Sequence, residues 1–190
     1  MDISSVLVAD SSQTSISQIK DILIKRGYRV YQASDGSAAL RIARGIRPHL
    51  VLMDVNLWGT DVFETGRLIE SEKLSTIVFM TAKPSREFLD KIGPMKVYAY
   101  ITKPINPVQL IQIVEFSLIN SNRIKTLEER VEKLESSLSA RKTIDRAKGI
   151  LMDTLGIPEQ DAYNRLRKMS MDEGKSMEWV AKGVIKKYDD

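Results

Sequence analysis

The 190-residue sequence predicts an α/β domain with a five-stranded parallel sheet, followed by a long helix and a small all-α module. Three observations predict this order of parts. Short apolar runs alternate with amphipathic stretches through residues 1–119. A heptad pattern of apolar residues follows, and short helical patterns separated by glycine and proline fill the last third.

Five short runs are predicted as strands because they are nearly continuous in apolar residues, as expected when both faces of a sheet are covered. They are Val6–Ala9, Arg29–Gln32, Leu50–Met53, Ile77–Met80 and Val97–Ile101. An amphipathic stretch at helical spacing follows each run: Ile16–Lys25, Ala38–Arg44, Phe63–Leu68, Phe88–Ile92 and Leu110–Leu118. Repeated strand-then-helix units predict a parallel sheet with right-handed crossovers and helices on both faces.

A heptad pattern then occupies residues 120–140. Its apolar positions recur at spacings of three and four: Ile124, Leu127, Val131, Leu134 and Leu138. Charged residues fill the gaps, and no glycine or proline stands between Pro107 and Gly149. The pattern predicts a helical linker whose apolar seam pairs two copies of the chain, giving a homodimer. The alternative is a single amphipathic helix that packs on a domain.

The last third reads as three short helices with a surplus of positive charge. The first helix ends near Gly156, Pro158 opens the second, Met171–Lys175 form a turn, and Ser176 caps the third. Residues 141–188 carry 11 Lys or Arg against 7 Asp or Glu. Such a surplus in a small module suggests an anionic partner such as nucleic acid.

The composition excludes several kinds of chemistry. There is no cysteine and His49 is the only histidine, which excludes disulfides, thiolate nucleophiles and histidine-clustered metal sites. No stretch approaches the roughly 18 apolar residues of a membrane span, and the first residues lack the pattern of a secretory signal. We therefore expect a cytoplasmic protein without membrane contact.

Polar residues follow four of the predicted strands: Asp10, Asp54, Thr81 and Lys103. Because the carboxyl ends of parallel strands meet at one edge of a sheet, these side chains are expected to share a crevice. Two carboxylates can hold Mg²⁺, and a carboxylate beside a divalent ion can accept a phosphoryl group. Lys103 would then neutralise the phosphoryl oxygens and Thr81 would bind them by a hydrogen bond.

Residues 1–119 resemble the receiver domain of bacterial response regulators. The matching segments are Val6–Asp10, the loop Asp54–Asp61, Thr81-Ala82 and Lys103-Pro104, with Tyr100 at the switch aromatic position. The resemblance implies a flavodoxin-like fold, phosphoacceptor Asp54, switch residues Thr81, Lys103 and Tyr100, and Mg²⁺ held by Asp10, Asp54 and Asn56. It also implies that a sensor histidine kinase donates the phosphoryl group.

Two departures from the receiver pattern bear on this site. Ser11 stands where the family usually has a second acidic residue, so weaker Mg²⁺ binding and slower phosphorylation are expected. Trp58 stands in the acceptor loop where proline is usual.

Residues 129–188 resemble the ANTAR module, the RNA-binding module named after the AmiR and NasR antitermination regulators. The matching segments are Ala147–Met152, Asp161–Tyr163, Leu166-Arg167, Ser170-Met171 and Val180-Ala181. The resemblance implies binding to paired hairpins in nascent messenger leaders, which prevents a terminator stem from forming. The RNA-binding residues expected from position are Arg141, Arg146, Ala147, Lys148, Gly149 and Arg167.

The combined prediction is a non-enzymatic response regulator that acts as a transcription antiterminator and is controlled by phosphorylation of Asp54. The alternative is a pseudo-receiver that is controlled by a protein partner without phosphorylation and still binds RNA. An enzyme acting on a small phosphorylated substrate is disfavoured because no phosphate-cradling glycine loop is present. Binding to double-stranded DNA is disfavoured because no helix-turn-helix pattern is evident.

Overall fold

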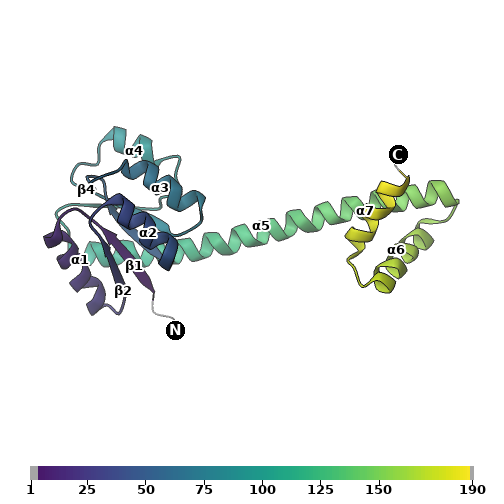
Figure 1. The fold of residues 1–190 in the computed structure, drawn as a ribbon, viewed down its shortest axis with the longest axis horizontal. Coiled ribbons are helices and arrows are strands. Elements are labelled where there is room, and N and C mark those ends of the chain that lie inside the picture. The colour runs from purple at the N-terminus through teal and green to yellow at the C-terminus, as the bar shows by residue number, and fades with distance from the viewer. Residues whose placement is uncertain (1–3, 189–190) are drawn as a thin grey trace. The chain divides into compact units, whose positions relative to one another are not determined.

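The computed structural model describes residues 4–188, and its strands form one parallel sheet (Figure 1). The strands are β1 (Ser5–Ala9), β2 (Arg29–Ala33), β3 (Leu50–Asp54), β4 (Thr76–Thr81) and β5 (Tyr100–Thr102). Their order across the sheet is β2-β1-β3-β4-β5. The chain therefore winds outward in opposite directions from β1 and β3, which is the flavodoxin-like arrangement. The predicted five-stranded parallel sheet is confirmed.

Helices cover both faces of this sheet and bury two separate apolar cores. On one face, α2 (Gly36–Ile46), α3 (Val62–Ser71) and α4 (Arg86–Ile92) pack on alternate strand residues such as Leu7, Val51 and Phe79. On the other face, α1 (Gln13–Lys25) and the start of α5 (Pro107–Leu155) pack on Val8, Leu52 and Met80. All five residues of β1 and of β3 are buried, as expected for inner strands covered on both faces, whereas only Ala33 is buried in the edge strand β2.

The helices begin earlier than their apolar patterns, because polar capping residues add a first turn. The side chains of Ser12, Asp35, Asp61 and Ser85 accept hydrogen bonds from the first-turn amides of α1, α2, α3 and α4. Asn106 does the same for α5, since its Oδ1 accepts from the amides of Val108 and Gln109. These bonds satisfy backbone donors that have no partner within the helix.

The last strand is shorter than the sequence predicts. The expected strand Val97–Ile101 is wrong at its start, because β5 begins at Tyr100. Its register pairs Tyr100 with Phe79 and Thr102 with Thr81. The preceding segment bonds elsewhere: the Lys96 amide donates to Oε2 of Glu70 on α3, at 3.1 Å. The chain therefore joins the sheet only where it reaches the end of β4.

The described residues from 125 to 188 form a second compact unit, and α5 is a single 49-residue helix that belongs to both units. Its last turns pack with α6 (Glu159–Glu173) and α7 (Met177–Tyr188). The buried core of this unit consists of Ala147, Leu151, Ala162, Leu166, Val180, Ala181 and Val184. The predicted three-helix module and the continuous helix before it are confirmed.

The ends of these helices correct two details. Gly156 has φ +66° and follows the last residue of α5, as predicted for a helix end. Pro158 is the N-cap of α6 rather than its first helical residue. The predicted turn Met171–Lys175 is wrong in its first half, because α6 continues to Glu173 and ends at Gly174, whose φ is +62°. The left-handed backbone at Gly174, rather than Met171, ends the helix.

None of the helices that the structure describes is long and apolar enough to cross a membrane.

Candidate functional site

Two buried carboxylates lie where the strand order reverses. Asp10 follows β1 and Asp54 ends β3, and their residues are only 3% and 4% exposed. The Nζ of Lys103, from the loop after β5, lies 2.6 Å from Oδ2 of Asp10 and also contacts Oδ2 of Asp54. One ammonium therefore joins both carboxylates, so three of the predicted residues lie together at the carboxyl edge of the sheet.

Opposing effects set the ionisation of this cluster. Burial by itself would raise the pKa of Asp10, but hydrogen bonds from Lys103, Ser15 and the Ser12 amide outweigh it and hold the pKa below its ordinary value. Burial by itself would lower the pKa of Lys103, but its bonds to Asp10 and Asp54 raise it. Asp10 is therefore an anion and Lys103 a cation at neutral pH.

Two serines near Asp10 have different roles. The hydroxyl of Ser15, on the first turn of α1, donates to Oδ2 of Asp10 at 2.6 Å, a contact that the sequence patterns did not single out. Ser11 is exposed, and its Oγ accepts a hydrogen bond from the Trp58 amide at 3.0 Å. Ser11 thus connects the loop after β1 to the loop after β3, which carries Asp54.

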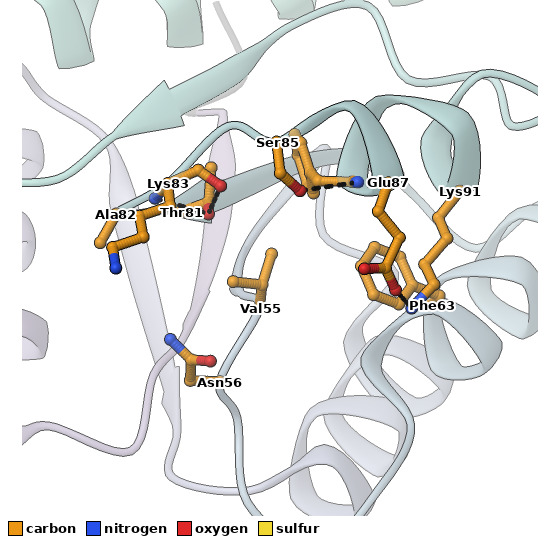
Figure 2. Close-up of a pocket in the computed structure, with 10 residues that line it drawn as sticks. Val55, Asn56, Phe63, Thr81, Ala82, Lys83, Ser85, Glu87 and Lys91 are labelled. Atoms are coloured by element: carbon orange, nitrogen blue, oxygen red, sulfur yellow. Dashed lines mark hydrogen bonds and ion pairs between the residues drawn. The ribbon is translucent and has the colours of Figure 1, made fainter.

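Thr81 is 3% exposed and borders an open cleft of about 470 Å³ (Figure 2). Its Oγ1 accepts from the Lys83 amide at 3.2 Å and lies 3.3 Å from the Lys83 carbonyl. Figure 2 shows Val55 and Asn56 on one side of the cleft and Ala82, Lys83 and Ser85 on another. The backbone amide of Asn56 donates to Oδ1 of Asp54 at 2.7 Å. The loop after β3 therefore connects the cleft to the carboxylates.

Tyr100 is half-buried and packs in an aromatic cluster. Its ring meets Phe88 edge-on, with centroids 5.5 Å apart, and Phe88 in turn packs against Phe63 and Phe79. Phe63 and Phe88 also line the cleft beside Thr81. Tyr100 therefore does not reach the carboxylates itself, and it is connected to the Thr81 cleft through Phe88.

The carboxylates also satisfy the chemistry of a magnesium site. Asp10 and Asp54 both reach the same ammonium, so their oxygens lie within reach of a single cation. Mg²⁺ is usually bound by one or two carboxylates and completes its shell with water. Within residues 4–188, no group of three or more Asp, Glu, His or Cys side chains gathers at one point. The residues present therefore fit a two-carboxylate site and no richer one.

The basic residues predicted to bind RNA lie in the second unit, with different surroundings. Arg141 is exposed, and its Nε lies 3.9 Å from Oδ2 of Asp145. Lys148 is mostly covered, with 15% of its side chain exposed, and its Nζ lies 2.8 Å from Asp145 and 2.7 Å from Glu159. The hydrogen bonds that Lys148 donates to Asp145 and Glu159 raise its pKa, and this ammonium joins α5 to the first residue of α6.

The two small residues on either side of Lys148 differ as well. Ala147, which the sequence predicts to permit close approach of RNA, is fully buried in the core of the second unit, where its small side chain lets the three helices pack. A Cβ added at Gly149 would meet no atom within 4 Å, so packing against another helix of the described chain does not account for this glycine. Arg146 and Arg167 are exposed.

Comparison with known proteins assigns both units. Residues 6–115 match the response regulator receiver domain, and residues 132–185 match the ANTAR domain. The transcriptional regulatory protein PdtaR of Mycobacterium tuberculosis is 30% identical over 181 residues, covering 95% of this chain and 88% of PdtaR. The transcriptional regulatory protein YvrH of Bacillus subtilis is 34% identical over 113 residues, covering 58% of this chain and 47% of YvrH.

Solved structures agree with the first assignment. A CheY-like receiver domain from Methanospirillum hungatei aligns with a TM-score of 0.61 at 22% identity, covering 64% of this chain and 98% of that one. The chemotaxis regulator CheY4 of Vibrio cholerae aligns with a TM-score of 0.57 at 24% identity, covering 60% and 98%. At this identity the likeness establishes the receiver fold alone. Together with the two matched domains, it means that the chain belongs to the response regulators with an N-terminal receiver domain and a C-terminal ANTAR domain.

Proposed function

We propose that the protein is a phosphorylation-controlled transcription antiterminator, and not an enzyme, in which the receiver domain regulates RNA binding by the ANTAR domain. The observation that carries the proposal is the Asp10–Lys103–Asp54 cluster, joined in one chain to an ANTAR module. We divide the chain into a receiver (1–119), a heptad linker (120–140) and an ANTAR domain (129–188) that shares the linker helix. A kinase and a nascent RNA as partners would place the protein in the cytoplasm.

In the proposed phosphorylation, a carboxylate oxygen of Asp54 attacks the phosphorus of a phosphohistidine on a sensor kinase. A P–O bond forms, the N–P bond breaks, and its electron pair returns to the imidazole. Lys103 already contacts Asp54, so it can move from the carboxylate to a phosphoryl oxygen without crossing the site. Thr81 would turn its hydroxyl from the Lys83 carbonyl toward the phosphoryl group, and that rearrangement would change the cleft and the Phe88–Tyr100 contact.

Mg²⁺ bound by Asp10, Asp54 and Asn56 would neutralise charge on the transferring phosphoryl group. Ser11 brings no carboxylate, and its hydroxyl is already bonded to the loop amide of Trp58. We therefore expect Mg²⁺ to bind more weakly here than at a site with a further carboxylate.

A dimer is proposed through the heptad seam, which the structure leaves open to solvent. Leu127, Val131, Leu134 and Leu138 are each between 52% and 65% exposed. Ile124 and Val131, β-branched residues that each stand three positions before a leucine of the seam, favour two parallel strands. In a parallel pair, Arg123 would face Glu128 of the second copy and Arg130 would face Glu135, whereas an antiparallel pair would place like charges together. Two ANTAR domains would then bind two hairpins, and their linkage would raise affinity.

For RNA binding, we propose that Arg141, Arg146 and Arg167 contact phosphates and that Gly149 allows close approach. Lys148 already has two carboxylate partners, so we propose that it positions α6 against α5. Arg141→Ala should then flatten the log–log salt dependence of RNA binding by about 0.7–0.9 per lost contact. Lys25→Ala, an exposed cation on α1, is the matched control and should leave the slope unchanged.

The central test treats the wild type and Asp54→Asn with a small phosphodonor and Mg²⁺. The wild type should gain one base-labile phosphoryl group and bind a two-hairpin RNA more tightly, while Asp54→Asn should do neither. Equal labelling of both proteins would contradict Asp54 as the acceptor. If neither protein is labelled but both bind the RNA, the pseudo-receiver alternative, controlled by a protein partner, would replace this proposal.

A further inference from the structure

The outward face of α7 carries a group of residues that the core of the module does not use. Its inward residues Val180, Ala181 and Val184 are buried. On the opposite side, at spacings of three, four and seven, stand Trp179, Lys182, Gly183 and Lys186. Trp179 is 54% exposed although it is the largest side chain of the helix.

Neither Trp179 nor Gly183 is explained by packing within the described chain. A Cβ added at Gly183 would meet nothing within 4 Å, so the glycine makes no room for a neighbouring helix. Glycine is also among the least favourable residues inside a helix, and a half-exposed indole leaves apolar surface in water. Gly183 therefore lowers the stability of the helix and Trp179 leaves apolar surface uncovered, which suggests that their benefit comes from a partner that approaches this face.

The charges around the indole indicate the chemistry of that partner. The Nζ of Lys175, in the turn before α7, lies 5.9 Å from the centroid of the Trp179 ring. Lys182 is held by Glu178 at 2.6 Å on the same helix, and Lys186 stands two turns after Trp179. A flat aromatic ring next to cations suits an unpaired nucleobase with its phosphates, because bases stack on such rings while lysines neutralise the backbone.

We propose that Trp179 is a stacking platform for an unpaired base in the hairpin loop of the bound RNA. Gly183 lets the stacked nucleotide approach the backbone of α7, and Lys175 and Lys186 face its phosphates. This assignment rests on the proposed RNA-binding function and adds α7 as a third RNA-contacting helix beside the predicted residues on α5 and α6.

The experiment uses the full-length chain in a Trp58→Phe background, so that Trp179 is the only tryptophan. Titration with a two-hairpin RNA should quench its fluorescence, and binding is measured independently by filter retention. Trp179→Ala should lower affinity by roughly 5- to 150-fold, the range for loss of one stacked base. Trp179→Phe should restore most of the affinity and Trp179→Leu should not, because stacking needs a ring.

Gly183→Ala separates binding from folding. It should raise the thermal midpoint of the module, because alanine favours the helix and its methyl group meets open space, yet it should weaken RNA binding. Gly45→Ala on α2 is the matched control, since a Cβ there also meets nothing within 4 Å. It should raise stability without changing RNA affinity.

The outcomes are distinguishable. RNA binding with unquenched Trp179 and unchanged affinity in Trp179→Ala overturns the stacking platform and leaves the proposed function standing. A wild type that binds no hairpin RNA in either phosphorylation state overturns both. Quenching that follows self-association in the absence of RNA would assign the face to a second copy and overturn the stacking platform.

Discussion

At the scale of single residues, Lys103 is the counterion on which two buried carboxylates depend. Lys103→Met should destabilise the receiver by about 3 kcal/mol at neutral pH, because it leaves Asp10 and Asp54 without their shared cation. Lys91→Met, which breaks the exposed pair with Glu87 and the contact of Lys91 with the Phe63 ring, is the control and should cost no more than about 1 kcal/mol. Chemical denaturation of the three proteins measures both values.

The stability difference between wild type and Lys103→Met should depend on pH, because the pKa values of Asp10 and Lys103 are both shifted. Asp10 has a pKa lowered from 3.8, so its contribution is present above about pH 4 and is lost as the pH falls through the folded pKa. Lys103 has a pKa raised from 10.5, so its contribution is present below that pH and is lost as the pH rises through the folded pKa. The difference between wild type and Lys103→Met should be widest between these limits, and a gap independent of pH would contradict the ion-pair explanation.

The effect of Mg²⁺ on thermal stability tests the same cluster of Asp10, Asp54 and Lys103 in a second way. Because Lys103 and the ion would compete for the same oxygens, saturating Mg²⁺ should raise the thermal midpoint of Lys103→Met more than that of the wild type. The thermal midpoint of each protein in chelator-containing buffer without divalent ions is the baseline. Equal shifts in both proteins would mean that the ion binds away from these carboxylates.

The sequence predicted Asp10, Asp54, Thr81 and Lys103 because each one follows a buried strand, and strand ends converge in a parallel sheet. Ser15 could not be singled out from the sequence, because several serines stand close together there. Only the folded helix α1 shows that the hydroxyl of Ser15 bonds to Asp10. The contact of Lys148 with Glu159 could not be predicted from the sequence, because Glu159 lies on the next helix, where no spacing rule applies.

At the scale of elements, the charges beside the heptad seam predict the orientation of the proposed dimer. Glu128→Arg with Glu135→Arg should abolish self-association, because each arginine would meet another across a parallel pair. Adding Arg123→Glu and Arg130→Glu should restore it by exchanging the signs. Sedimentation of the double and quadruple variants in low salt tests this, and a quadruple variant that stays monomeric would contradict the parallel register.

The core of the seam has its own test. Replacing Val131 and Leu134 by lysine should keep the chain monomeric, since four like charges would meet in an apolar contact. Receiver folding should be unaffected, because neither residue belongs to its cores. A dimer that survives this double substitution would remove the seam from the proposed mechanism.

The elements were predictable to the extent that apolar periodicity marks them. The patterns located every helix, but helix ends are set by polar caps such as Asp35 and by Gly174, whose left-handed backbone stops α6 later than expected. The start of β5 was overestimated because Val97 is apolar and packs against the core without joining the sheet. Apolar periodicity predicts which residues are buried, but a residue belongs to a strand only if its backbone also bonds to a neighbouring strand.

At the scale of the whole molecule, the two units bury cores that share no residue. Leu166→Ala should therefore destabilise the ANTAR unit by about 2–5 kcal/mol, and Leu52→Ala should do the same for the receiver. Amide hydrogen exchange should show faster exchange in α6 and α7 for the first variant and in the sheet for the second. Loss of protection in both units from either substitution would contradict independent cores.

The shared helix α5 also constrains how such a protein can change in length or be recombined. A loop between domains absorbs inserted residues, but α5 runs unbroken from Pro107 to Leu155. Deleting one residue in the linker would turn everything beyond it by about 100° about the helix axis, whereas deleting seven would nearly preserve the phase of the seam. Chimaeras that exchange receivers should thus work only when spliced in steps of a heptad, so helical phase restricts which sensing and RNA-binding halves can be interchanged.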